Sequence, residues 1–128
     1  MYFIYVSTDV EAIGLLEEVL QRVDKSKMLL AMANGYDLIH FLQNVKRGES
    51  FPELIILSDK KSRLNGKELL ELLKTDDIYR LIPVVLLLAG DDEIDEHTYR
   101  RLGADIIPVP SIPKDWVAAA KKMCAACN

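Results

Sequence analysis

The chain has few cysteines, no long apolar run and no excess of positive charge, and each of these absences excludes a class of protein. Its two cysteines, Cys124 and Cys127, lie close together near the C-terminus and form no disulfide framework. No apolar stretch approaches the roughly 20 residues needed to cross a bilayer. With 16 basic and 20 acidic residues the net charge is −4, which leaves no electrostatic footprint for nucleic acid. We therefore expect a cytoplasmic protein that binds neither nucleic acid nor a membrane.

Internal repeats, linkers and low-complexity tracts are also absent. Half of the 128 residues are hydrophobic, which suffices for one sizeable core and leaves no room for a second. The segment Ser7 to Glu11, which follows the first apolar run, contains no glycine and so offers no glycine-rich phosphate loop. We expect a single domain over residues 1–128, without an output domain.

Short apolar runs alternate with amphipathic segments along the whole chain. The runs predict five strands, at Tyr2 to Val6, Lys27 to Met32, Leu54 to Leu57, Pro83 to Leu88 and Ile106 to Val109. An amphipathic helix is expected after each strand, and this strict alternation implies a parallel sheet with helices on both faces. In such folds ligand chemistry collects at the carboxyl ends of the strands.

Several helix boundaries carry signals of their own. Asp9 is a good N-cap for the first helix, and Asn34 with the following glycine opens the second. The acidic run Asp91-Asp92-Glu93 suits the positive end of the dipole of the fourth helix, which Gly103 ends. Pro113 starts the last helix at a position where proline is tolerated.

The spacing of three motifs resembles that of response-regulator receiver domains, the CheY-like family. Pro52 stands six residues before Ser58 and Gly66 eight after it, as in the central segment of that family. Ile82-Pro-Val-Val is similar to the lead-in to the family's fourth strand, and Leu102-Gly-Ala-Asp105 to the segment before the fifth. The resemblance covers the whole chain. It implies a flavodoxin-like α/β receiver fold, a single doubly wound five-stranded parallel sheet of order 2-1-3-4-5 flanked by five helices.

The resemblance also locates the phosphorylation site of the family, and this chain departs from the family there. The acceptor aspartate falls at Ser58, and the acidic pair that holds part of the magnesium site falls at Ser7 and Thr8. The switch positions, which in the family are a hydroxyl, an aromatic and a lysine, fall at Leu88, Ile107 and Pro110. Neutral hydroxyls lack the charge that magnesium needs, and serine is a poor nucleophile without an adjacent base. We expect a degenerate pseudo-receiver with no metal, no cofactor and no catalytic residue.

A shift of the alignment does not restore this site. Asp59 as the acceptor would break the spacing to both Pro52 and Gly66. A shift by one on the fourth strand supplies no hydroxyl, and a shift on the fifth places Val109 where the family has lysine. The losses therefore indicate a changed site and not a misplaced alignment.

The expected function is that of a stand-alone receiver-like module of two-component signalling. It would not be an enzyme and would act by contact with a protein partner. In the family, the face made by the fourth helix, the fifth strand and the fifth helix often carries dimerisation or effector docking. The candidates on this face are Tyr99, Arg100 and Trp116, and the face could also form a homodimer. Trp116 could equally cover the core.

Two other functions stay open. The chain could be a flavodoxin-like domain that binds a small ligand or phosphate, with Ser7, Thr8 and Ser58 in a polar pocket, or a module regulated by phosphorylation of Ser58. Hydroxyls at strand ends more often bond backbone groups or cap helices. Cys124-Ala-Ala-Cys127 has the spacing of a metal or redox motif, but a zinc site would need two further ligands.

Overall fold

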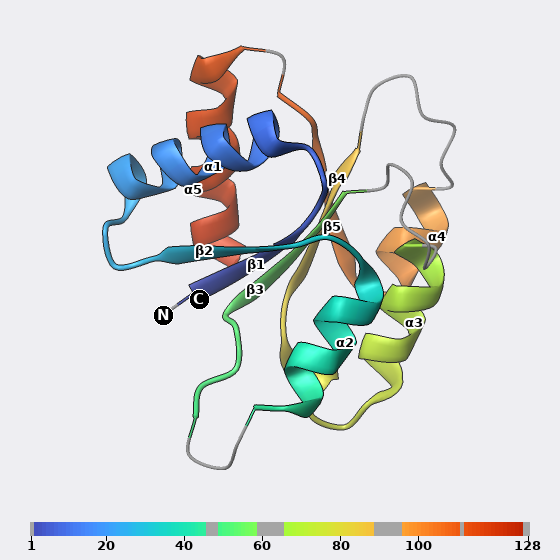
Figure 1. Cartoon of the computed structure of the whole chain (residues 1–128). Helices are drawn as coiled ribbons and strands as arrows, with labels where there is room; N and C mark the ends of the chain where they lie inside the picture. The colour runs from blue at the N-terminus through green and yellow to red at the C-terminus, as the bar shows by residue number, and fades with distance from the viewer. Residues whose placement is uncertain (1, 46–48, 59–65, 89–95, 111, 127–128) are drawn as a thin grey trace.

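One five-stranded parallel sheet forms the centre of the molecule (Figure 1). The computed structural model describes residues 2–45, 49–58, 66–88, 96–110 and 112–126. The strands are β1 (Tyr2–Val6), β2 (Met28–Met32), β3 (Leu54–Ser58), β4 (Val84–Leu88) and β5 (Ala104–Pro108). Their spatial order, β2-β1-β3-β4-β5, confirms the predicted fold class.

Helices cover both faces of the sheet (Figure 1). On one face lie α1 (Val10–Val23) and α5 (Pro113–Ala126), and on the other lie α2 (Gly35–Gln43), α3 (Gly66–Thr75) and α4 (Glu96–Arg101). A 3₁₀ turn, η1 (Tyr79–Leu81), lies between α3 and β4. Within the ranges that the structure describes, no helix has both the length and the apolar character to span a bilayer.

Side-chain alternation along the strands divides the core into two layers. Phe3 and Tyr5 point toward α1 and α5, whereas Ile4 and Val6 point toward α2, α3 and α4. The same division continues in β3, where all four residues from Leu54 to Leu57 are buried. Because both faces are covered, the inner strands are apolar at successive positions, as the sequence predicted.

The predicted helix signals lie at the ends of the observed helices. Asp9 Oδ1 accepts a hydrogen bond from the Ala12 amide at 3.1 Å, and Asn34 Oδ1 accepts one from the Asp37 amide at 2.9 Å. Gly103 follows α4 with a φ of 97°, in the left-handed region that favours glycine. The α5 helix begins at Pro113, as expected. The acidic run at 91–93 lies outside the described residues.

Three strands, β2, β3 and β4, differ from the predicted ranges by one residue at an end, and two elements differ by more. The fifth strand begins at Ala104 and ends at Pro108, whereas the apolar run predicted Ile106 to Val109. Asp105 pairs with Val85 in the sheet while its side chain is exposed, so a polar residue is tolerated there. The turn η1 was not predicted. It forms because Asp76 Oδ1 accepts hydrogen bonds from the amides of Ile78 and Tyr79, at 2.8 and 2.9 Å.

An ion pair joins the amino ends of β2 and β3 across β1. Lys27 Nζ lies 2.8 and 2.9 Å from the two carboxylate oxygens of Glu53. The two side chains are only 11% and 18% exposed, so the pair is largely withdrawn from water. Lys27 Nζ also lies 5.8 Å from the centre of the Phe3 ring, and the Glu53 amide donates to the Tyr2 carbonyl at 2.9 Å. The first three strands are therefore tied together at this end of the sheet.

Lys27→Met should lower the free energy of unfolding by about 2 kcal/mol or more, because it leaves the Glu53 carboxylate half-desolvated and without its cation. The double variant Lys27→Met/Glu53→Leu should recover most of that loss, as measured by urea unfolding. The matched control is Arg22→Met, which breaks the exposed Arg22–Glu18 pair and should cost about 0.5 kcal/mol or less. Equal losses for Lys27→Met and Arg22→Met would contradict this account.

Candidate functional site

Because every pairing is parallel, the carboxyl ends of all five strands lie at one edge of the sheet. Val6 pairs with Leu57 between β1 and β3, and Ser58 pairs with Leu87 between β3 and β4. Ser7 and Ser58, which each follow the Val6–Leu57 pair by one residue, therefore come to the same level of the sheet. Doubly wound folds bind their ligands at this edge, at the carboxyl ends of the strands. In this chain the hydroxyls of Ser7 and Ser58 lie there.

The Ser7 hydroxyl is used to build the turn between β1 and α1. Ser7 Oγ accepts a hydrogen bond from the Asp9 amide at 3.1 Å, and the Ser7 amide donates to the Met32 carbonyl at 2.9 Å. Asp9 is in turn the N-cap of α1, so the serine orients the residue that starts the helix. Thr8 is exposed. The expectation that strand-end hydroxyls bond backbone groups is confirmed for Ser7.

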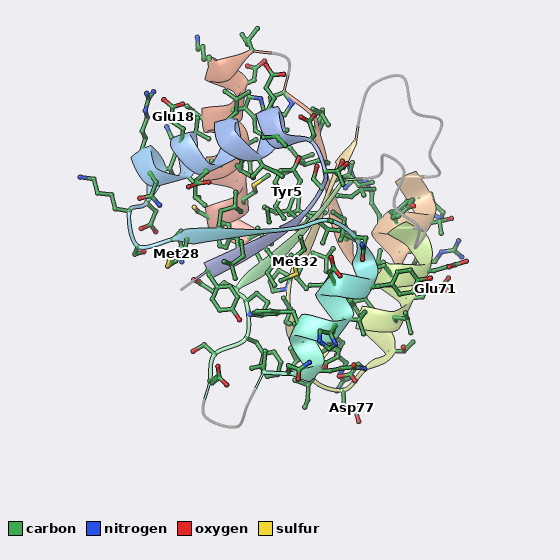
Figure 2. All side chains as sticks on the ribbon, viewed as in Figure 1. Tyr5, Glu18, Met28, Met32, Glu71 and Asp77 are labelled. Atoms are coloured by element: carbon green, nitrogen blue, oxygen red, sulfur yellow. The ribbon has the colours of Figure 1, made fainter. Side chains whose placement is uncertain are left out.

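The phenol of Tyr5 lies beneath this turn, in the layer between the sheet and α1 (Figure 2). Burial raises the pKa of Tyr5 above its ordinary value. A hydrogen bond with the Ser7 side chain lowers the pKa in part, and the negative charge of Asp9 raises it again. Burial therefore favours the neutral phenol, and Ser7 and Asp9, which shape the end of β1, shift its pKa in opposite directions.

The other positions assigned by the resemblance are placed as follows. Ser58 is the last residue of β3 and is half-buried, and Leu88 is the last residue of β4. Ile107 is buried in the layer with α1 and α5, and Pro110 is half-buried beyond the end of β5. Asp59, the alternative acceptor, lies outside the described residues. Among the residues that the structure does describe, no three His, Cys, Asp or Glu side chains gather as a metal site would need.

Both aromatic candidates for an exposed interface are buried. Tyr99 is 6% exposed and packs with the α2, α3 and α4 layer, and Trp116 is 3% exposed and packs with the α1 and α5 layer. Large rings at these helix positions contribute more by filling the core than by facing water. The expectation that Tyr99 lies at the surface is therefore corrected, whereas for Trp116 the alternative that it covers the core is confirmed. Arg100 is exposed, and its role in an interface stays a prediction.

Sequence reasoning missed a groove between the end of β5 and α5. Its volume is about 380 Å³, and its lining includes Val109, Pro110, Asp115 and Lys122. Val109 is 40% exposed, so the groove presents apolar surface between two opposite charges. The repeated prolines at this end of the chain were the available signal, because proline ends a strand and leaves the backbone beside it irregular.

Solved structures of response regulators share this fold. The phosphorylated cyanobacterial phytochrome response regulator RcpA matches with a TM-score of 0.81 at 22% identity, over 94% of this chain and 89% of that one. The Mn²⁺-bound form of response regulator Rcp1 matches with a TM-score of 0.77 at 23% identity, over 94% of this chain and 89% of that one. The chemotaxis response regulator CheY4 of Vibrio cholerae matches with a TM-score of 0.74 at 14% identity, over 95% of this chain and 97% of that one.

Comparison with models of known protein families gives no match, and neither does comparison with curated proteins. At identities this low the structural likeness establishes the fold. The chain therefore has the fold of response-regulator receiver domains.

The buried Tyr5 phenol predicts a loss of stability in alkali. Its pKa is raised in the folded state, so its contribution is fully present below about pH 10 and is lost as the pH rises through the folded pKa. Tyr5→Phe should flatten the fall of the unfolding free energy above pH 10, measured by urea unfolding across the pH range. Tyr36→Phe, which alters an exposed ring on α2, is the matched control. Parallel curves for wild type and Tyr5→Phe would contradict the prediction.

Proposed function

We propose that this chain is a receiver-like module of two-component signalling that works by contact with a protein partner and without phosphorylation on aspartate. The proposal rests on the hydroxyls of Ser7 and Ser58, which lie at the carboxyl ends of β1 and β3. Ser58 stands where the resemblance expects the acceptor aspartate, and Ser7, level with it, stands where it expects a metal-binding carboxylate.

The residues that the structure describes at this edge do not fit the magnesium ion that receivers use. A hard divalent cation is held by oxygen ligands that usually include carboxylates, and the two hydroxyls here are neutral. The oxygen of Ser7 already accepts the Asp9 amide, and the carboxylate of Asp9 already accepts the Ala12 amide. RcpA is known in a phosphorylated form and Rcp1 in a manganese-bound form, so this edge is where the chain would differ most from those proteins.

The surface proposed to dock the partner is the face of α4, β5 and α5. Arg100 and Arg101 are exposed on α4, and Asp115 and Lys122 border the groove between β5 and α5. The groove offers apolar contact through Val109 and Pro110, and the charges around it offer selectivity. An interface of this kind would use the groove and the arginines, because the rings of Tyr99 and Trp116 are in the core.

Treatment with acetyl phosphate and magnesium should leave the mass of the intact protein unchanged, because the neutral hydroxyl of a serine at position 58 is a weak nucleophile unless a base activates it. A receiver that retains its acceptor aspartate is the positive control. A labile acyl phosphate on Asp9 or Asp59 would refute the proposal. A stable phosphoserine at Ser58 in protein taken from native cells would favour regulation by a serine kinase instead.

Charge reversal on the proposed docking face should reduce capture of a defined protein partner in an affinity pull-down. The variants are Arg100→Glu and Lys122→Glu, both at exposed positions. Loss of one strong rim charge is expected to weaken binding by about fivefold to tenfold. Arg22→Glu on α1, also exposed, is the matched control and should leave capture unchanged. Equal capture by all variants would exclude this face.

A further inference from the structure

The outer edge of β2 is open and carries no charge. β2 is the first strand in the spatial order, and within the described ranges only β1 pairs with it. Its sequence is Met-Leu-Leu-Ala-Met. Edge strands are usually protected by charged residues or proline. The opposite edge strand, β5, has both, because Asp105 is exposed and the strand ends at Pro108.

The lysine that could protect β2 is engaged elsewhere. Lys27, immediately before the strand, is bound to Glu53 on the inner side and is 11% exposed. One hydrogen bond shows which backbone groups of β2 face outward. The Met32 carbonyl accepts the Ser7 amide of the neighbouring segment, so Met32 bonds inward. Since direction alternates along a strand, Leu29 and Ala31 present their amides and carbonyls to the open edge.

An exposed methionine lies at the beginning of β2, and a groove lies beside its end. Met28 is 61% exposed and lies at the beginning of β2, and Met32 lies at its end, near α2 (Figure 2). A groove of about 420 Å³ between β2 and α2 is lined by Met32, Ala33, Phe41 and His40, among others. Met28 and Met32 are four residues apart, so both side chains leave the same face of the sheet.

We propose that a second copy of this chain pairs with the outer edge of β2. The two β2 strands would run antiparallel about a two-fold axis at Leu30, and would join the two sheets into one. Met28 of each copy would then stand opposite Met32 of the other and enter the groove beside α2. Opposed residues of an antiparallel pair lie about 4.5–5.5 Å apart at Cβ, which is within reach of a methionine.

The backbone supports this register. With Leu30 opposite Leu30, each Leu29 stands opposite an Ala31, and these are the residues whose amides and carbonyls face outward. The Leu30 pair would be a non-hydrogen-bonded pair, in agreement with the inward direction of its backbone groups. Registers centred on Leu29 or Ala31 also match the hydrogen-bonding pattern, but they move Met28 away from Met32.

The proposed antiparallel pair also brings together opposite charges that lie outside β2. Lys25 is exposed two residues before Lys27, and Asp37 is exposed in the first turn of α2. An antiparallel pairing brings the beginning of one β2 to the end of the other, so Lys25 of each copy approaches Asp37 of the other. Asp24 and Lys27 at the beginning of β2, and Tyr36 and His40 on α2, are further titratable groups at these two ends. A two-fold contact closes on itself and leaves β5 free in both copies.

Sedimentation velocity across a concentration series tests the proposal. The wild type should form a dimer, and Ala31→Pro and Met28→Glu should each raise its dissociation constant about tenfold or more. Ala31→Pro removes an amide that faces outward and so spares the bonds to β1. Leu72→Glu is the matched control, because Leu72 is 52% exposed on α3, far from this edge. A wild type that stays monomeric, or a dimer that both variants leave unchanged, would overturn the proposal.

Two further variants test the register. In a Cys124→Ser/Cys127→Ser background, Leu30→Cys should form a disulfide-linked dimer on mild oxidation, because Cα atoms in a non-hydrogen-bonded pair are about 4.5 Å apart. Leu72→Cys in the same background should stay monomeric. Lys25→Asp and Asp37→Lys should each weaken the dimer, and the double variant should restore it. Crosslinking at both positions, or no restoration, would count against antiparallel pairing at Leu30.

Discussion

The structure depends on the burial of both faces of a parallel sheet. Crossover helices must cover each face, and so the inner strands carry apolar side chains at successive positions. Phe3 and Tyr5 enter one layer while Ile4 and Val6 enter the other, and among the described residues no charged side chain is fully buried in either layer. Polar chemistry is left with the strand ends, where Ser7 and Ser58 lie side by side in the register. The same constraint that builds the core therefore decides where a site can be.

The alternation of strands and helices could be predicted because periodicity and N-caps are local, as Asp9 and Asn34 illustrate. The start of β5 could not be predicted. The exposed Asp105 interrupts the apolar run in the sequence, although its backbone still pairs with β4 in the sheet. The sequence also did not determine whether the rings of Tyr99 and Trp116 are buried. A single aromatic residue on a short or mixed helix does not reveal which side faces the sheet, and both rings proved to be buried.

The chain resembles receivers in its strand order and in its pattern of apolar residues more than in the identity of particular residues. CheY4 of Vibrio cholerae matches with 14% identity, so most positions differ while the strand order is kept. Apolar character at core positions is enough to maintain such a sheet, whereas a phosphorylation site needs particular atoms at particular places. The spacing of Pro52, Ser58 and Gly66 predicts where the phosphorylation site of the family would lie, and this stays a prediction. What those residues do in a cell depends on partners, and a fold does not encode them.

The two edges of the sheet differ, and the difference bears on how the protein behaves when concentrated. A sheet with two bare edges can add strands without end and grow into a fibre. Here β5 carries Asp105 and ends in proline, so strands can be added only at β2. Growth by edge pairing must then stop after a single addition, whatever molecule makes it. The chain can therefore keep one open edge at high concentration without polymerising through its sheet.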